Sequence, residues 1–149
     1  SYAVTTAKTL GLSVAYAAAP FNAQAVQAVM GSLDLLILNA VEAEQLHQAT
    51  GHSPAQLPVR DIIVTLGAEG CLWYGIEGQQ QFEAIAVEPV DTTGAGDTFT
   101  GYVLAGLDRG MPMAQAISLG IKAAGLMVTR LGTADVIPDL KDLQDAQLI

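Results

Sequence analysis

The sequence predicts an α/β fold, in which a mostly parallel sheet is flanked by helices and carries an antiparallel hairpin at one edge. Two observations lead to this class. Over the first 65 residues, short apolar runs alternate with longer helical patterns, as in parallel sheets whose strands are connected by helices. After residue 70, two strand-like segments follow one another with only a polar turn between them, which is the pattern of an antiparallel pair.

The first half of the chain has the pattern helix, strand, helix, strand, helix, strand. Gly11, Pro20 and Gly51 separate these elements, because Gly and Pro interrupt regular structure. The apolar runs are short and nearly continuous, which suits strands that are buried on both faces of a parallel sheet. The predicted helices cover 2–10, 23–30 and 40–50, and the predicted strands cover 12–17, 35–38 and 61–65.

The second half is predicted to contain the hairpin, two long helices and a short final helix. The hairpin turn is placed around Glu77-Gly78-Gln79, and the Gly-rich segment Asp91–Gly96 precedes the first long helix. No internal repeat or domain linker is visible, so residues 1–149 are treated as a portion of one domain. The predicted strands cover 71–75 and 81–87, and the predicted helices cover 97–107, 113–129 and 140–146.

The composition favours a globular protein that binds neither nucleic acid nor membranes. Hydrophobic residues make up 51% of the 149 residues and charged residues 14%, which is enough apolar material for a core. The net charge is −9 with only six Lys and Arg residues, whereas nucleic acids and anionic membranes attract a clustered basic face. No apolar run reaches the ~18 residues that a membrane helix needs.

A single cysteine, Cys71, excludes an internal disulfide and a cysteine-based zinc site. No long apolar segment follows a basic start at the N-terminus, so no secretory signal is visible. We therefore expect a cytoplasmic protein. Because the sequence opens at Ser1 within a helical pattern, we also expect it to be a piece of a longer protein.

The segment Asp91–Tyr102, Asp-Thr-Thr-Gly-Ala-Gly-Asp-Thr-Phe-Thr-Gly-Tyr, has the features of a loop that binds an anion. It lies where an extended segment meets a helix, and the first N–H groups of a helix have no intrahelical partner and lie at the positive end of its dipole. Gly94 and Gly96 permit unusual backbone angles and close approach of a ligand. Such a loop holds a phosphate through backbone amides, which suits a chain with few Lys and Arg residues.

Asp97 follows this loop directly, and its carboxylate suits a base that accepts the proton of a hydroxyl attacking a phosphoryl group. The amides of Gly94, Ala95, Gly96 and Asp97 would stabilise the charge on the transferred phosphoryl. The alternative is structural: Asp97 caps the helix and the glycines only make a turn. The segment has no Gly-Lys-Ser/Thr and no third Gly at Phe99, which excludes a P-loop and the dinucleotide fingerprint.

The full string, Asp-Thr-Thr-Gly-Ala-Gly-Asp-Thr-Phe-x-Gly, resembles the C-terminal signature of the ribokinase-like (PfkB) family of sugar kinases. The resemblance extends along the whole chain. It implies a three-layer ribokinase-like fold of which only the C-terminal, nucleotide-binding part is present. It also implies ATP-dependent phosphorylation of a sugar hydroxyl, with Asp97 as catalytic base and with ATP and Mg²⁺ as cofactors. Fructokinase, ketodeoxygluconate kinase and nucleoside kinase are alternatives within the family.

Two further motifs extend the resemblance. Asn39-Ala-Val-Glu42 is similar to the family's Asn-x-x-Glu motif, which implies that Glu42 orders Mg²⁺ through water and that Asn39 contacts the phosphates and the metal. From the residues alone, the same motif is typical of a capping box. Val64–Gly70 is similar to Val-Thr-Leu-Gly-x-x-Gly, which implies nucleotide contacts; the alternative is a turn into the hairpin. The implied contacts are Thr65, Gly67, Ala68 and Gly70.

A monovalent-cation site is also implied, because Met127–Gly132 resembles the segment that binds K⁺ through backbone carbonyls in some family members. Many of those members have a Ser just before the final Val/Ile-Pro, where this chain has Val136. That difference argues against K⁺ activation. The candidate ligands carried over from the family are Asp91, Thr93, Met127, Arg130 and Gly132.

The family's N-terminal half carries most sugar contacts, a Gly-Gly motif and a small lid, and none of these is found in this sequence. We therefore expect the 149 residues by themselves to be inactive on sugar, and to be a nucleotide-binding or structural piece. We expect the full-length protein to phosphorylate a small-molecule sugar and to form a homo-oligomer, namely a dimer.

Overall fold

The structure, a computed structural model, describes residues 14–17, 22–84 and 95–127. These residues form two compact units, and each is treated by itself below. The first unit holds the described residues up to Gly67 together with Cys71–Gln81. The second unit holds Ala68–Gly70 and the described residues from Phe82 onward.

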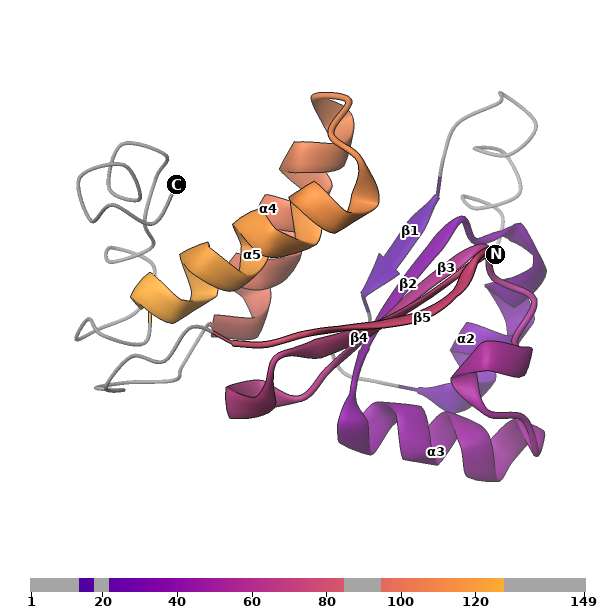
Figure 1. The fold of residues 1–149 in the computed structure, drawn as a ribbon. Coiled ribbons are helices and arrows are strands. Elements are labelled where there is room, and N and C mark those ends of the chain that lie inside the picture. The colour runs from indigo at the N-terminus through magenta and orange to yellow at the C-terminus, as the bar shows by residue number, and fades with distance from the viewer. Residues whose placement is uncertain (1–13, 18–21, 85–94, 128–149) are drawn as a thin grey trace. The chain divides into compact units, whose positions relative to one another are not determined.

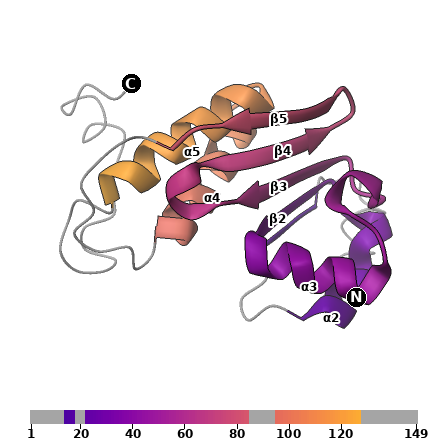
Figure 2. The ribbon, with the colours of Figure 1, turned by 60° about the horizontal axis from the view of Figure 1, so that its bottom comes forward.

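The first unit is built on a five-stranded mixed sheet in the order β1-β2-β3-β4-β5 (Figure 2). The first three strands run parallel, and β4 runs antiparallel to β3. A two-residue turn connects β4 to β5, which therefore runs antiparallel to β4 at the sheet edge. The strands are β1 (Ala15–Ala17), β2 (Leu35–Asn39), β3 (Asp61–Thr65), β4 (Cys71–Gly75) and β5 (Gly78–Phe82).

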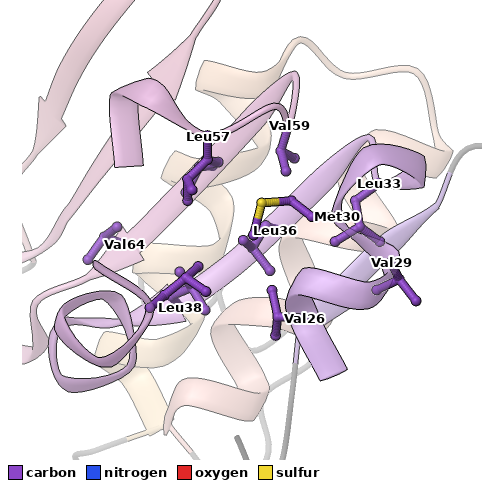
Figure 3. Packing of buried hydrophobic residues seen from close by; sticks show 11 residues of the cluster. Val26, Val29, Met30, Leu33, Leu36, Leu38, Leu57, Val59 and Val64 are labelled. Atoms are coloured by element: carbon purple, nitrogen blue, oxygen red, sulfur yellow. The ribbon is translucent and has the colours of Figure 1, made fainter. Parts of the chain in front are cut away.

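Short helices of this unit pack on one face of the sheet and enclose its core (Figure 3). The parallel register places Leu36 beside Ile62 and Leu38 beside Val64 on that face. The helices are α2 (Ala23–Val29), the 3₁₀ turn η1 (Met30–Ser32), α3 (Ala40–Thr50) and the 3₁₀ turn η2 (Pro54–Gln56). The buried cluster consists of Val26, Val29, Met30, Leu33, Leu36, Leu38, Leu46, Leu57, Val59, Ile62 and Val64.

The opposite face of β2 and β3 is buried as well. Leu35, Ile37 and Ile63 alternate with the core residues along the two strands and are at most 6% exposed. Strands that are buried on both faces have continuous apolar sequences instead of alternating ones. This burial explains why β2 and β3 were recognisable as unbroken apolar runs.

At the amino end of β3, a buried carboxylate has hydrogen-bond partners. The carboxylate of Asp61, which is only 8% exposed, accepts a hydrogen bond from Trp73 Nε1 at 3.0 Å and another from Arg60 Nε at 3.0 Å. A buried carboxylate needs such partners because its desolvation is costly. The network connects β3 to β4 at the end of the strands that is remote from the predicted nucleotide motifs.

The second unit consists mainly of two helices, α4 (Ala95–Asp108) and α5 (Met113–Met127), which pack as a hairpin (Figure 1). Two glycines let the helices approach closely. A Cβ atom on Gly106 would lie 3.1 Å from Ala116 Cβ, and one on Gly120 would lie 2.8 Å from Val103 Cγ2. The short turn η3 (Gly67–Glu69) spans the boundary between the units.

The predicted boundaries agree with the structure for α3, β3 and β4. Other boundaries were wrong by one or more residues. β5 begins at Gly78 and not at Gln81, because a two-residue turn keeps the strands paired up to the turn and the exposed glutamines lie on the edge strand. α4 begins at Ala95, two residues before the predicted start. Predicted segments outside the described residues are 2–10, 12–13, 85–87, 128–129 and 140–146.

Among the helices that the structure describes, none combines the length and the apolar character that crossing a bilayer requires.

Replacing Gly120 with Ala should destabilise the helical hairpin. The added methyl group would lie 2.9 Å from the carbonyl oxygen of Phe99 and 2.8 Å from Val103 Cγ2, so the helices must separate. Such overpacking costs about 1–3 kcal/mol, measurable by urea denaturation. The matched control is Gly101→Ala on α4, where no atom of a described residue lies within 4 Å of the added Cβ. Equal stability of Gly120→Ala and the wild type would contradict the packing described.

Candidate active site

The carboxyl ends of β2 and β3 carry the candidate nucleotide-binding residues of the first unit. Asn39 ends β2, Thr65 ends β3, and the parallel register pairs these two residues directly. The helix α3 starts immediately after Asn39. Ligands of open α/β sheets bind beyond the carboxyl ends of the strands. The structure thus brings together two of the residues that the sequence assigned to nucleotide binding.

Asn39 and Glu42 form a capping box at the start of α3. Asn39 Oδ1 accepts a hydrogen bond from the amide of Glu42 at 2.8 Å, and the amide of Asn39 donates to Glu42 Oε1 at 2.8 Å. The capping box that the sequence motif suggested as an alternative is therefore present in the structure. Glu42 Oε2 has no hydrogen-bond partner among the described residues, and Asn39 is exposed. One carboxylate oxygen thus remains available for a ligand while the other caps the helix.

The described residues do not form a metal cage. They contain no group of three or more His, Cys, Asp or Glu side chains placed to hold a metal ion. Mg²⁺ in phosphoryl-transfer sites is usually held by one or two carboxylates, several waters and the phosphates of the substrate. The lone oxygen of Glu42 fits that mode of binding, in which the nucleotide supplies the remaining ligands.

The backbone conformation of the turn after β3 explains why it contains glycines. Gly67 and Gly70 have φ of 61° and 92°, which side chains rarely adopt. A Cβ atom on Gly70 would also overlap the carbonyl oxygen of Phe82. Ala68 lies between them in η3, and the hydroxyl of Thr65 donates to the carbonyl of Leu38 at 3.4 Å. The turn therefore serves the hairpin, whether or not it also contacts a nucleotide.

The start of α4 carries the candidate catalytic residues of the second unit. Asp97 is the third residue of the helix, is exposed, and makes no hydrogen bond or ion pair with any described residue. An N-cap residue precedes the first helical residue, so Asp97 is not the N-cap. The structural alternative for Asp97 was therefore wrong, since the helix begins two residues earlier.

Gly96 is the second residue of α4 and is exposed, whereas Ala95 is half-buried. Because Gly96 lies in a helix and is not among the described glycines with positive φ, the expected unusual backbone angle is wrong for this residue. No atom of a described residue lies within 4 Å of the position that a Cβ would take. Neither backbone strain nor packing in the described residues requires Gly96. Gly94 lies outside the described residues.

No role was predicted for Thr98 from the sequence. It is 3% exposed, and its hydroxyl has no hydrogen-bond partner among the described residues. Buried hydroxyls usually have a partner, so this atom is the one unsatisfied polar side-chain atom found in the described core. The only available sequence signal was its place in the signature, directly after Asp97.

Of the predicted cation ligands, only Met127 lies within the described residues. This residue ends α5, and its side chain is 1% exposed. The last carbonyls of a helix have no intrahelical partner, so the backbone of Met127 could serve as a ligand. In the hairpin, the end of α5 lies at the same end as the start of α4 (Figure 1). Asp91, Thr93, Arg130 and Gly132 lie outside the described residues.

Comparison with known families agrees with these motifs. The model of the pfkB family carbohydrate kinases matches residues 3–140. The chain belongs to this family. The match covers nearly all of the sequence, and it confirms the family that the signature at Asp91–Tyr102 indicated.

Ribokinases and related kinases are similar to this PfkB chain. The ribokinase of Lactococcus lactis is 37% identical over 83 residues, which are 56% of this chain and 28% of the relative. The aminoimidazole riboside kinase of Salmonella typhimurium is 37% identical over 111 residues, which are 66% of this chain and 35% of the relative. Neither relative is matched over half of its length.

Solved structures confirm the ribokinase-like α/β fold. The crystal structure of ribokinase from Cryptococcus neoformans in complex with ADP superimposes with a TM-score of 0.87 and 25% identity. The superposition covers 97% of this chain and 56% of that ribokinase. The chain therefore spans about half of a protein with this fold.

The thiol of Cys71 should be almost inert in the folded chain. Burial raises the pKa of Cys71 from 9.0 to about 11, so at pH 8 the thiolate fraction is about a hundred times smaller than in the unfolded chain. A thiol reagent such as DTNB should react at least that much more slowly with the native protein than with the urea-unfolded protein.

The raised pKa of Cys71 also determines how the stability of the folded chain changes with pH. Because the pKa of Cys71 is raised in the folded state, the stability contributed by the neutral thiol is fully present below pH 9 and is lost as the pH rises through about 11. Equal labelling rates for folded and unfolded protein at pH 8 would show that the thiol is not buried.

Proposed function

We propose that the chain is the nucleotide-binding part of a ribokinase-like kinase that transfers the γ-phosphoryl group of ATP to a sugar hydroxyl. The proposal rests on the arrangement of residues at the start of α4. Asp97 is exposed there without a partner among the described residues, and Gly96 has no structural reason in them to be glycine. Close approach of a ligand to the backbone supplies that reason.

In this proposal Asp97 accepts the proton of the sugar hydroxyl as its oxygen forms a bond to the γ-phosphorus. The bond between that phosphorus and the bridging oxygen breaks, and ADP leaves. The amides at the start of α4, including those of Ala95 and Gly96, donate hydrogen bonds to the transferred phosphoryl oxygens. The positive end of the helix dipole lies at the same place. A chain of net charge −9 can thus hold phosphate without basic side chains.

Nucleotide binding is assigned to the carboxyl ends of β2 and β3. Asn39 and Thr65 are adjacent there, and Glu42 keeps one carboxylate oxygen without a partner among the described residues. Mg²⁺ would neutralise charge on the phosphates when bound. Glu42 would hold it through water, and the turn at Gly67, Ala68 and Gly70 would contact the nucleotide. Support comes from the ADP complex of the similar Cryptococcus neoformans ribokinase.

A riboside is the second candidate acceptor. The Salmonella typhimurium relative is named aminoimidazole riboside kinase and is as identical to this chain as the Lactococcus lactis ribokinase, at 37%. The residues that hold the acceptor's remaining groups are expected in the half of the protein that this chain does not span. Comparing turnover of ribose and of a riboside by the full-length protein separates the two candidates.

Asp97→Asn in the full-length protein should lower kcat by about 10²–10⁴, the range typical of losing a general base. Asn keeps the shape of the side chain, so the helix should stay folded. The matched control is Asp108→Asn, which removes another exposed carboxylate at the far end of α4. Retention of the rate within about tenfold by Asp97→Asn would overturn the assignment of the base.

The variant Glu42→Gln should distinguish the two roles of Glu42, which are capping α3 and positioning Mg²⁺. A Gln side chain can maintain the capping box, so the free energy of unfolding should stay within about 0.5 kcal/mol of the wild type. The Mg²⁺ dependence of ADP binding should weaken about 10–100-fold, as expected when a group that positions a metal is lost. Calorimetric titrations of the full-length protein measure this change.

The contrasting variant is Asn39→Ala, which removes the cap and should cost about 1 kcal/mol of stability. If Glu42→Gln leaves the Mg²⁺ dependence unchanged, Glu42 only caps α3.

A further inference from the structure

The four methionines of the chain differ in how easily a dissolved oxidant reaches them. Met30 and Met127 are only 5% and 1% exposed, whereas Met111 and Met113 are half-buried. Met111 lies in the connection between α4 and α5, and Met113 is the first residue of α5. Because the oxidation of a sulfur atom depends on its exposure, the thioethers most open to oxidation lie where the helical hairpin turns.

The closing turn of α4 fixes the backbone of Met111. Gly110 has a φ of 86°, and its amide donates a hydrogen bond to the carbonyl of Leu107 at 3.0 Å. The amide of Met111 donates to the carbonyl of Gly106 at 3.0 Å. These two bonds form a Schellman motif, in which the residues at the two ends usually make an apolar contact. The motif therefore brings Met111 close to Gly106.

The thioether of Met111 lies at a close contact between the two helices. A Cβ atom on Gly106 would lie 3.1 Å from Met111 Sδ and 3.1 Å from Ala116 Cβ. The side chain of Met111 also packs against the cluster that Leu119 and Ala123 form on α5. Met111 thus links the end of α4 to α5, and its sulfur has little room on the side of Gly106.

A purely structural role would also account for a methionine at this position. Met is flexible and fills irregular gaps in cores, and Leu fills a similar volume at little cost. The two readings differ in chemistry, since Leu has no sulfur to oxidise. Replacing Met111 with Leu therefore keeps the packing and removes the reactive atom.

We propose that Met111 is a site of reversible oxidation that loosens the helical hairpin. The oxidant is a peroxide such as hydrogen peroxide. Its oxygen–oxygen bond breaks as Sδ forms a bond to one oxygen, and the other oxygen leaves as water. The sulfur loses two electrons and the peroxide gains them, which gives the sulfoxide. Two thiols reverse the step: the sulfoxide oxygen leaves as water, and the thiols join in a disulfide.

The sulfoxide oxygen is polar and does not suit the contact at Gly106. If the oxygen stays in the apolar contact, it is buried without a hydrogen-bond donor, which is costly. If it turns to water, the side chain withdraws from Gly106 and from the cluster on α5. In both cases the link between the helices weakens. Because the hairpin fixes the direction of α4, turnover at Asp97 should fall as well, and this last consequence rests on the proposed function.

The test treats the folded 149-residue chain with hydrogen peroxide. Mass spectrometry of its peptides should show Met111 and Met113 oxidised before Met30 and Met127. In urea denaturation, the oxidised chain should have a folding equilibrium constant lower by about tenfold or more, because a polar oxygen disturbs an apolar contact. Treatment with methionine sulfoxide reductases should restore the original value.

Two variants assign the effect to one sulfur atom. Met111→Leu should fold nearly as stably as the wild type and should keep its stability after peroxide treatment. The matched control is Met113→Leu. Met113 is also half-buried, but it is not among the residues packed against Leu119 and Ala123, so this variant should lose stability on oxidation as the wild type does. Cys71 should not compete, because its thiol is buried.

The proposal is overturned if Met111 is oxidised no faster than Met30 and Met127, or if Met111→Leu loses as much stability under peroxide as the wild type. Stability that the reductases do not restore would also overturn it, since the oxidation would then be plain damage. The unfolding measurements need no enzyme activity. A full-length protein that never turns over ATP and a sugar would therefore reject the proposed function alone, whereas an oxidised chain of unchanged stability would reject only this inference.

Discussion

The parallel pairing of β2 with β3 is the constraint on which the first unit depends. Its register places Asn39 level with Thr65 and, on the face below, Leu36 and Leu38 level with Ile62 and Val64. A slip by one residue would exchange the side chains of the two apolar faces and would separate Asn39 from Thr65. The same register that fills the core therefore also fixes the edge where the capping box begins α3. Core packing and the candidate nucleotide edge are two consequences of one pairing.

The second unit bears on a different problem, which is how an acidic chain would hold phosphate in the proposed function. A close helical hairpin, with contacts at Gly106 and Gly120, fixes the direction of α4. Its first turn offers backbone amides and an exposed carboxylate at Asp97. Backbone groups and the helix dipole supply positive potential without basic residues. The acidity of the sequence and the proposed phosphate chemistry are thus compatible.

Much of the fold was predictable because both cores leave simple sequence patterns. The doubly buried strands β2 and β3 are unbroken apolar runs, and Asn39 and Gly51 mark both ends of α3. The start of β5 was not predictable, since polar Gln residues suit an exposed edge strand as well as a turn. Likewise, Gly96 could only be placed inside α4 by the structure, because Gly favours loops over helices. The sequence motifs identified Asp97, but they gave no sign of the hydroxyl of Thr98, which has no hydrogen-bond partner among the described residues.

We propose that the carboxyl edge of β2 and β3 binds the Mg-nucleotide through Asn39, Glu42 and Thr65. Amide chemical shifts of the ¹⁵N-labelled chain, recorded while Mg-ADP is added, test it directly. Asn39, Glu42 and Thr65 should shift together along a single binding curve, while Asp61 at the amino end of β3 stays unchanged. Shifts confined to Asp61 and its neighbours, or no shift at Asn39, Glu42 and Thr65, would contradict this proposal.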